Sequence, residues 1–333
     1  MTLSLLLPAE FEAPYRQLVE HDLARVCEVR ERFWIDRVSP DELVSLAAES
    51  EILVVTVEQI DVETIARLSE LRLIAKFGAG TDNIDIDGAS RRGIWVTNAP
   101  GANSASVAQM ALSLILSCAR SIPEADQVVR AGEWRLVYGT EISGKTLGVI
   151  GTGRIGRALI RMLEGFQMRV LAWDRVHDES LVAIGNTEYV ELSQIAEECD
   201  VISVHLPLAR DTRGILNSDF FRRMKRRPIF VNTARGEVVD EKALCSAIES
   251  GSISAVGVDV LGREPPRATD PLLQFPNVLV TPHIGGSTME AISRIGAMLV
   301  EDVRALESGE QPPHAVNTDD FDRSADSSRG GGA

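Results

Sequence analysis

The sequence predicts an α/β fold in which parallel β-sheets are flanked by helices. Short runs of Val, Ile and Leu alternate along the chain with longer segments that have the periodicity of helices. Several of the expected strands contain continuous runs of Val, Ile and Leu, as expected of strands that are buried on both faces of a parallel sheet. Such alternation indicates βαβ units joined by right-handed crossovers. A chain of 333 residues is also too long for one ordinary core, so we expect two domains.

The expected strands are short and end where polar or turn-forming residues begin. In chain order they are Ser4–Leu7, Ile52–Val57, Leu73–Lys76, Trp95–Thr97, Thr146–Ile150, Arg169–Trp173, Val201–Val204, Ile229–Asn232, Ala255–Val260 and Val278–Thr281.

Two helices separate and close the strand-containing blocks. The first block ends near the turn Asn98-Ala99-Pro100-Gly101. A buried helix of about five turns then starts near residues 103–106, with Ser106 and Gln109 as a capping box. The second block runs to about Ser287, and a last helix is expected over Met289–Ser308. The segment beyond Asn317 is rich in Asp, Ser and Gly, which predicts disorder.

The charge of the chain argues against two classes of partner. Its formal net charge is −15, so nucleic acids and anionic membranes are not expected to bind it. A site for an anionic substrate must therefore be locally positive.

Cysteine usage and hydropathy indicate a cytoplasmic protein. Cys27, Cys118, Cys199 and Cys245 are scattered and form no CxxC pair, so we expect no metal site and thiols that stay reduced. The first residues lack the basic start of a signal peptide. The longest apolar stretch, Val107–Cys118, is too short to span a bilayer.

A glycine-rich loop follows the expected strand Thr146–Ile150. Its sequence is Gly151-Thr152-Gly153-Arg154-Ile155-Gly156, and a helical pattern follows it. Gly151 permits the tight turn, Gly153 lets a pyrophosphate approach the backbone, and Gly156 lets the helix and strand pack closely. Free N–H groups at the start of the helix would hold the phosphates. The loop predicts a dinucleotide site; the alternative is a similar turn that binds no ligand.

An acidic residue ends the next strand. Asp174 follows Arg169–Trp173, at about the 20-residue distance from the glycines that is typical of dinucleotide sites. A carboxylate there accepts hydrogen bonds from ribose hydroxyls and repels a 2′-phosphate, which favours NAD over NADP. The adjacent Arg175 weakens this preference slightly.

Later strands end in residues that can transfer protons or bind anions. Because ligands gather at the carboxyl ends of strands in open α/β sheets, we expect these residues to converge. They are His205-Leu206-Pro207-Leu208, Thr233-Ala234-Arg235-Gly236, Asp259 with Arg263-Glu264-Pro265, and Pro282-His283-Ile284-Gly285-Gly286.

Oxidation of a secondary alcohol requires such a set. A histidine can take the hydroxyl proton while hydride leaves carbon, and a carboxylate can orient the ring. An arginine can bind the substrate and polarise its carbonyl in the reverse direction. Taken singly, each residue has a structural alternative. His283 also suits a strand end, Glu264 a solvated loop, Arg235 an ion pair with Asp240, and His205 a packing position.

These motifs, in this order, resemble the D-isomer-specific 2-hydroxyacid dehydrogenase family. The resemblance runs from about Ile52 to Asn317 and is densest from Gly144 to Thr288. Residues 145–156 are similar to the cofactor signature and Asn232–Gly236 to the arginine motif. Residues 259–265 are similar to the glutamate segment and 282–288 to the histidine motif.

The resemblance implies two Rossmann-like domains, with a cofactor domain inserted into a discontinuous substrate domain. Residues 1–101 and 288–317 would form the substrate (catalytic) domain, and 102–287 the NAD-binding Rossmann domain. Residues 318–333 would remain as a disordered tail. The family also implies a homodimer that associates through the cofactor domains.

The resemblance also implies roles for individual residues. His283 would be the acid/base, Glu264 its partner, and Arg235 the group that binds and polarises the substrate. The backbone at Ala79 and Gly80 would hold the substrate carboxylate. NAD contacts are expected from Gly151, Gly153, Arg154, Ile155, Gly156, Asp174, His205, Pro207, Thr212, Thr233, Ala234, Asp259 and Gly286.

The substrate is expected to be a small anionic 2-hydroxy or 2-keto acid. Residues 139–142 and 285–288 are most like those of phosphoglycerate dehydrogenases. However, Thr56-Val57 stand where those enzymes have an Arg-Ser pair that helps hold the substrate phosphate, and no regulatory domain follows Asn317. Phosphoglycerate, glyoxylate and hydroxypyruvate therefore remain alternative substrates.

The alternative from another functional class is a non-catalytic protein that senses NAD(H). The intact set of Arg235, Glu264 and His283 argues against this alternative.

Overall fold

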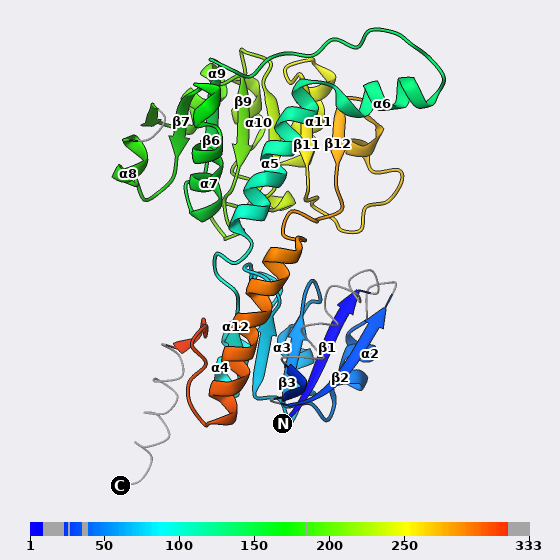
Figure 1. The fold of residues 1–333 in the computed structure, drawn as a ribbon, viewed down its shortest axis with the longest axis vertical. Helices are drawn as coiled ribbons and strands as arrows, with labels where there is room; N and C mark the ends of the chain where they lie inside the picture. The colour runs from blue at the N-terminus through cyan, green and yellow to red at the C-terminus, as the bar shows by residue number, and fades with distance from the viewer. Residues whose placement is uncertain (9–22, 26, 35–38, 184–185, 319–333) are drawn as a thin grey trace. The chain divides into compact units, whose positions relative to one another are not determined.

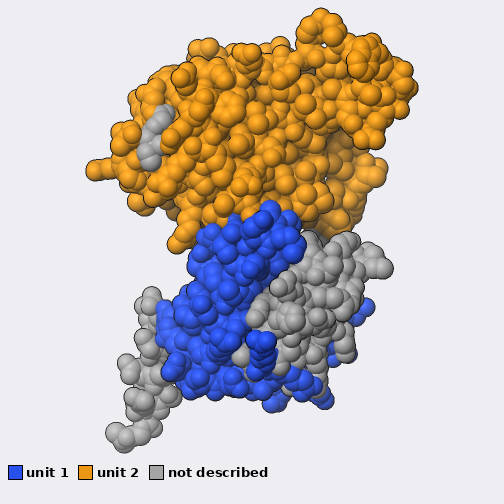
Figure 2. All heavy atoms as spheres, viewed as in Figure 1, with its two compact units in different colours: residues 1–103, 287–333 blue, residues 104–286 orange. Residues whose placement is uncertain are grey.

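The computed structural model describes residues 1–8, 23–25, 27–34, 39–183 and 186–318. The chain divides into two compact units (Figure 2). Unit 1 contains Met1–Asn103 and the segment from Ser287 onward, whereas unit 2 is the continuous segment Ser104–Gly286.

Unit 1 is built around a five-stranded parallel sheet with the order β2-β1-β3-β4-β5. All of its strand pairs are parallel, as the sequence predicts. The strands are β1 (Thr2–Pro8), β2 (Glu28–Trp34), β3 (Ile52–Val55), β4 (Leu73–Lys76) and β5 (Trp95–Thr97).

Helices cover both faces of this sheet. One face packs against α12 (Met289–Glu307), whose buried side chains include Ile295, Leu299 and Val303. Figure 1 shows this helix, in orange, lying along strands from the N-terminal part of the chain. The other face packs against α2 (Pro40–Ala47), α3 (Val62–Ala66) and α4 (Ile86–Arg91). Unit 1 is therefore completed by a helix that follows unit 2 in the sequence.

Unit 2 has a seven-stranded parallel sheet with the order β12-β11-β10-β9-β6-β7-β8. The strand order reverses beside β6, which pairs with both β7 and β9, so the ends of β6 and β9 border the crevice where such sheets bind ligands. The strands are β6 (Thr146–Ile150), β7 (Arg169–Trp173), β8 (Thr187–Tyr189), β9 (Val201–Val204), β10 (Ile229–Asn232), β11 (Ala255–Val258) and β12 (Val278–Val280).

Apolar cores lie on both faces of the second sheet. Helices α5 (Ser104–Ala119), α7 (Arg154–Met162) and α8 (Glu179–Val182) contribute to one core. Helices α9 (Leu192–Glu198), α10 (Ser218–Arg222) and α11 (Glu241–Glu249) contribute to the other. Helix α6 (Ile122–Arg130) follows α5. Short 3₁₀ helices span Leu23–Arg25, Glu164–Phe166, Gly236–Val238 and Pro271–Gln274.

All the strands expected from the sequence are present, but two further strands were not predicted. These are β2 and β8, and each is an edge strand that pairs with one neighbour only. Strand β2 has the sequence EVRERFW, and β8 is only three residues long. Neither has the continuous apolar run of a strand buried on both faces, so the criterion used for the central strands could not detect them.

Three expected strands end earlier than predicted. Strand β3 stops at Val55, because the carboxylate of Glu58 accepts the backbone N–H groups of Thr56 at 2.7 Å and Val57 at 3.1 Å. Strands β11 and β12 stop at Val258 and Val280, before the loops that carry the candidate site.

The predicted capping box at the start of α5 was wrong. This helix already begins at Ser104, so Ser106 lies in its first turn and is buried.

Within the described residues, no single helix is long and apolar enough to cross a membrane. Only α5 and α6 taken together, with a bend of 62° between them, reach that length and apolarity. Nearly all of the predicted tail, 318–333, lies outside the described residues.

Candidate active site

The glycine loop joins β6 to α7 in unit 2. Gly151 has a left-handed φ of 99°, and a Cβ there would lie 2.7 Å from the carbonyl oxygen of His205. A Cβ at Gly156 would lie 2.1 Å from the carbonyl oxygen of Gly151, so only glycine allows α7 to pack this closely. Gly153 is different, because no heavy atom lies within 4 Å of its would-be Cβ. No side chain caps α7, which leaves N–H groups of its first turn, beginning at Arg154 and Ile155, for a phosphate.

Asp174 at the end of β7 is hydrogen-bonded to the glycine loop. Its Oδ2 accepts the backbone N–H of Thr152 at 2.7 Å and the Thr152 hydroxyl at 3.2 Å. Among the described residues, its Oδ1 accepts only a long bond, 3.4 Å, from the backbone N–H of Val176. Since a carboxylate oxygen can accept two hydrogen bonds, Oδ1 retains capacity for ribose hydroxyls. The neighbouring Arg175 forms an ion pair with Asp211.

Two buried polar atoms at the ends of β9 and β10 have no hydrogen-bond partner among the described residues. They are Nδ1 of His205 and Oγ1 of Thr233. The other ring nitrogen of His205 bonds to the Ser203 hydroxyl at 2.9 Å. Buried polar atoms normally have hydrogen-bond partners. These two atoms therefore fit a polar ligand at the carboxyl ends of the strands, where a dinucleotide would lie. Burial lowers the pKa of His205 to about 4, which keeps its ring neutral and unsuited to general base catalysis at neutral pH.

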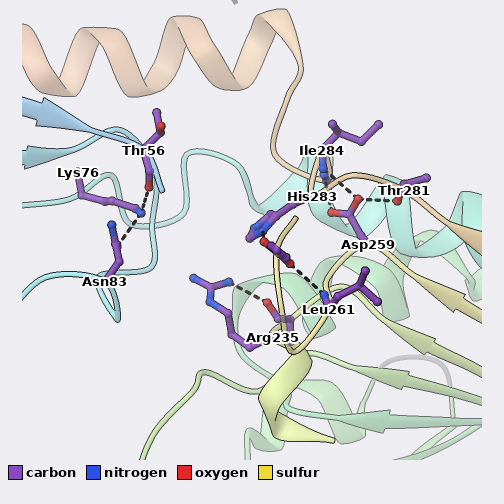
Figure 3. Close-up of polar contacts among 12 residues, drawn as sticks. Thr56, Lys76, Asn83, Arg235, Asp259, Leu261, Thr281, His283 and Ile284 are labelled. Atoms are coloured by element: carbon purple, nitrogen blue, oxygen red, sulfur yellow. Dashed lines mark hydrogen bonds and ion pairs between the residues drawn. The ribbon is translucent and has the colours of Figure 1, made fainter. Parts of the chain in front are cut away.

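The structure brings His283 and Glu264 into direct contact, as Figure 3 shows. Nδ1 of His283 lies 2.7 Å from Oε2 of Glu264, and Oε1 of Glu264 accepts the backbone N–H of Leu261 at 2.9 Å. Because the carboxylate is an acceptor, Nδ1 carries the ring hydrogen and Nε2 is left to exchange a proton with a substrate. Both side chains are partly exposed, at 38% for His283 and 24% for Glu264.

The carboxylate of Asp259 holds the turn that presents His283. His283 itself has a left-handed φ of 56°, which is unusual for a residue with a Cβ. Asp259 Oδ1 accepts the Thr281 hydroxyl at 2.5 Å and the Ile284 N–H at 2.9 Å, while Oδ2 accepts the Gly285 N–H at 2.7 Å. Asp259 is 2% exposed, so these bonds lie in the protein interior. The expected contact of Asp259 with the cofactor stays a prediction.

Arg235 follows β10, the strand beside β11. Asn232 shapes its turn, because its side chain donates to the carbonyl of Arg235 at 2.9 Å and accepts the N–H of Ala234 at 2.9 Å. The guanidinium donates to the Ala234 carbonyl at 2.8 Å. A Cβ on Gly236 would lie 2.0 Å from the carbonyl carbon of Leu261. Glycine at this position therefore lets the arginine turn lie against the loop that carries Glu264.

The predicted substrate-carboxylate loop lies in unit 1, directly after β4. Asn98 donates to the Ala79 carbonyl at 2.5 Å, and the Ala99 N–H donates to the Gly78 carbonyl at 2.8 Å, so the loop is tied to the end of β5. Gly80 and Ala79 are both partly exposed. Lys76 donates to the Thr56 carbonyl and, at 2.8 Å, to Asn83 Oδ1, as Figure 3 shows. A positive charge thus lies at the end of β4.

The remaining predicted cofactor residues lie on loops of unit 2. The hydroxyl of Thr212 donates to the Pro207 carbonyl at 2.6 Å and accepts the Ala209 N–H at 2.8 Å, so Thr212 folds the loop after β9. Ala234 is buried beside Thr233, and Gly286 is the last residue of unit 2.

Sequence reasoning missed several residues that organise the site. Thr152 and Asn232 lie within motifs identified from the sequence, and Lys76 ends an expected strand, but no role in the site was predicted for their polar side chains. Tyr189 was missed because it lies on the undetected edge strand β8.

A dinucleotide loop, a strand-end acid and a histidine–carboxylate pair on one parallel sheet define the class of nicotinamide-dependent dehydrogenases. The residues fit NAD, since open space at Gly153, an uncapped helix start and unpaired buried polar atoms occur where the dinucleotide would bind.

Comparisons with known proteins identify the family. Residues 112–285 match the family model described as "D-isomer specific 2-hydroxyacid dehydrogenase, NAD binding domain". The chain is 38% identical over 312 residues to a glyoxylate reductase of Korarchaeum cryptofilum, covering 91% of this chain and 94% of the relative. It is 40% identical over 284 residues to a D-3-phosphoglycerate dehydrogenase of Archaeoglobus fulgidus, covering 84% of this chain but only 54% of that relative.

Solved structures show the same similarity. A D-lactate dehydrogenase of Aquifex aeolicus, complexed with NAD and lactic acid, has a TM-score of 0.79 and 29% identity, covering 93% of this chain and 96% of that one. The TT0316 protein of Thermus thermophilus has a TM-score of 0.83 and 32% identity, covering 95% of this chain and 100% of that one. The chain belongs to the D-isomer specific 2-hydroxyacid dehydrogenase family and is an NAD-dependent oxidoreductase that acts on the CH–OH group of donors.

Proposed function

We propose that this enzyme interconverts a small unphosphorylated 2-keto acid, such as glyoxylate or hydroxypyruvate, with the corresponding 2-hydroxy acid, which has the D configuration where carbon 2 is a stereocentre. The observation that carries the proposal is the 2.7 Å contact between His283 and Glu264, which orients an acid/base beside the expected nicotinamide site. NAD, when bound, supplies the hydride acceptor or donor for carbon 2.

The protein residues would handle the proton and the charges. In the oxidation direction, Nε2 of His283 takes the hydroxyl proton, and Glu264 stabilises the imidazolium that forms. In reduction, the same nitrogen returns the proton to the carbonyl oxygen. Arg235 polarises that carbonyl, and the backbone of Ala79 and Gly80 holds the substrate carboxylate. Arg235 supplies a local positive charge, which an anionic substrate requires in a chain of net charge −15.

The loop after β3 supports an unphosphorylated substrate. The carboxylate of Glu58 is already the anion bound by the N–H groups of Thr56 and Val57, and Glu58 is buried. This loop contacts the substrate-carboxylate loop through Asn83, whose side chain donates to the Glu58 carbonyl at 2.6 Å. A distal phosphate near this loop would meet a buried negative charge and no free amide pair.

The test is a spectrophotometric screen of NADH oxidation with glyoxylate, hydroxypyruvate and phosphohydroxypyruvate. We expect turnover with the unphosphorylated acids, and losses of about 10²-fold to 10⁴-fold in kcat for His283→Ala. Arg235→Ala should lose kcat and raise the KM for the keto acid. Absence of turnover across the panel at high enzyme concentration would contradict the proposal. If turnover is absent, a protein partner that binds this chain in a pull-down only when NADH is present would support the NAD(H)-sensing alternative.

We further propose that the enzyme is a cytoplasmic homodimer. All four cysteines are free, and burial raises the pKa of Cys118 and Cys199 to about 12, which suits inert thiols in a reducing compartment.

The homodimer is supported by an exposed apolar arm, which we define as residues 122–139 of unit 2. Its exposed side chains include Trp134 at 92%, Tyr138 at 83% and Leu136 at 77%. Exposed apolar surface of this kind marks association sites.

A further inference from the structure

We propose that Tyr189 is a positioning residue that sets the preference of this enzyme for NADH over NADPH. Tyr189 ends β8, the edge strand beside β7, and its hydroxyl lies 2.9 Å from the hydroxyl of Thr152 in the glycine loop. Through Thr152 it acts on Asp174, the residue expected to meet the adenosine ribose.

The hydrogen bonds around Tyr189 have a fixed direction. The backbone N–H of Asp178 can only donate, so the Tyr189 oxygen accepts it at 3.0 Å. The Thr152 hydroxyl donates its one hydrogen to the Asp174 carboxylate, which can only accept. Thr152 must therefore accept the hydrogen of Tyr189. The result is one chain of donors that runs from Asp178 through Tyr189 and Thr152 to Asp174.

The surroundings of the chain restrict the motion of its members. Thr152 is 4% exposed, and the Tyr189 ring stacks on His177 with centroids 4.2 Å apart and planes 13° from parallel. Asp178 is itself held, because its side chain forms an ion pair with Arg157 of α7 and caps α8. The tyrosine hydroxyl is thus presented to Thr152 by a packed ring.

This arrangement decides which oxygen of Asp174 meets the ribose. Oδ2 is occupied by the two donors of Thr152, so Oδ1 is the acceptor left for ribose hydroxyls. A carboxylate held in this way cannot rotate aside for a 2′-phosphate. Arg175, the adjacent cation, is engaged with Asp211 and exposed. Selectivity therefore depends on the hydroxyl of Tyr189 as well as on the charge of Asp174.

The experiment measures dissociation constants of NADH and NADPH by fluorescence titration of the full chain. Tyr189→Phe keeps the stacked ring and removes only the hydroxyl. We expect it to weaken NADH binding by about threefold to tenfold, the effect of one hydrogen bond, with NADPH binding unchanged or tighter. The KM for NADH should rise with kcat unchanged. Tyr138→Phe, on the exposed arm, is the matched control and should bind both cofactors as the wild type does.

Substitutions at Thr152 separate this positioning role from simple packing. Thr152→Val should reproduce the loss of selectivity, Thr152→Ser should largely restore it, and Tyr189→Phe should add nothing to Thr152→Val. The proposal is overturned if Tyr189→Phe keeps the wild-type ratio of NADH to NADPH affinity. It is equally overturned if the effects of Tyr189→Phe and Thr152→Val on that ratio add. If Tyr189→Phe lowers the melting temperature strongly, the Thr152 series alone decides, because Thr152→Val must then lose selectivity and Thr152→Ser must keep it.

Discussion

The imidazole of His283 is held by contacts on the ring and by the conformation of its own backbone. Glu264 contacts Nδ1, while Asp259 binds the N–H groups of the two residues that follow His283. The left-handed φ of 56° costs free energy, typically about 1–3 kcal/mol for a residue in a sparsely populated region, and persists because these bonds over-determine the turn. Contacts within the protein therefore fix the orientation of the ring.

Glu264→Gln should test how much catalysis depends on this orientation. An amide in place of the carboxylate can present an N–H group to Nδ1 and favour the wrong ring tautomer, and it cannot stabilise imidazolium. We expect kcat to fall by about 10²-fold or more with the KM for NADH unchanged. Steady-state kinetics over a pH series measures both. A variant with wild-type kcat would show that Glu264 does not assist His283.

His205 should make the folded state sensitive to acid. Burial lowers its pKa from about 6.5 to about 4, so between these values the unfolded chain binds a proton that the folded chain does not. Above about pH 6.5 this residue therefore does not lower the free energy of unfolding. As the pH falls from 6.5 toward 4, the free energy of unfolding decreases, by up to about 3 kcal/mol from this residue. Urea unfolding at several pH values should show a smaller pH dependence in His205→Asn. The exposed His177, changed to Asn, serves as control. Equal pH slopes for wild type and His205→Asn would contradict the prediction.

At the scale of elements, the site depends on loops that approach one another closely. Gly236→Ala would place a Cβ 2.0 Å from the carbonyl carbon of Leu261 and 2.2 Å from the N of Gly262, so the loop that carries Glu264 must move. We expect kcat to fall and stability to drop by about 1–3 kcal/mol, with NADH affinity kept. Thermal melting and kinetics measure these effects. Gly262→Ala, whose Cβ would make only an ordinary 3.5 Å contact, should behave like the wild type. Similar behaviour of the two variants would rule out the steric argument.

The sequence predicted central elements well and edge elements poorly. Strands such as β6, β9 and β10 consist mainly of apolar residues because both faces are buried, and their predicted bounds match the structure. Strands β2 and β8 lie at sheet edges, where charged and short segments are tolerated and give no such pattern. Strand β3 ends early because of one side chain, Glu58, whose capture of two N–H groups no periodicity could reveal.

The candidate site follows a similar division. The glycine loop and the order of the arginine, glutamate and histidine motifs could be read from the sequence, since each follows a recognisable strand. The backbone of His283, the bonds of Asp259 and the link from Tyr189 to Thr152 could not. They depend on contacts between segments far apart in the chain, which a single sequence does not encode in any local pattern.

At the scale of the whole molecule, the exposed apolar arm predicts association. Replacing Trp134 and Leu136 by Ser should convert a dimer into a monomer, because exposed aromatic and aliphatic groups provide the apolar surface that association would bury. Analytical ultracentrifugation measures the mass. Val176→Ser, which removes an apolar side chain of 77% exposure outside the arm, should leave the mass unchanged. A wild-type chain that sediments as a monomer at micromolar concentration would refute the prediction.

The discontinuity of unit 1 has a consequence for the order in which a newly made chain can fold. Translation releases β1 to β5 first, yet the sheet face that receives Ile295, Leu299 and Val303 must wait until α12 leaves the ribosome. Unit 2 is contiguous, so its own sheet and helices are complete before α12 is made. The segment translated first is thus finished last, and its apolar face stays uncovered until α12 has been made.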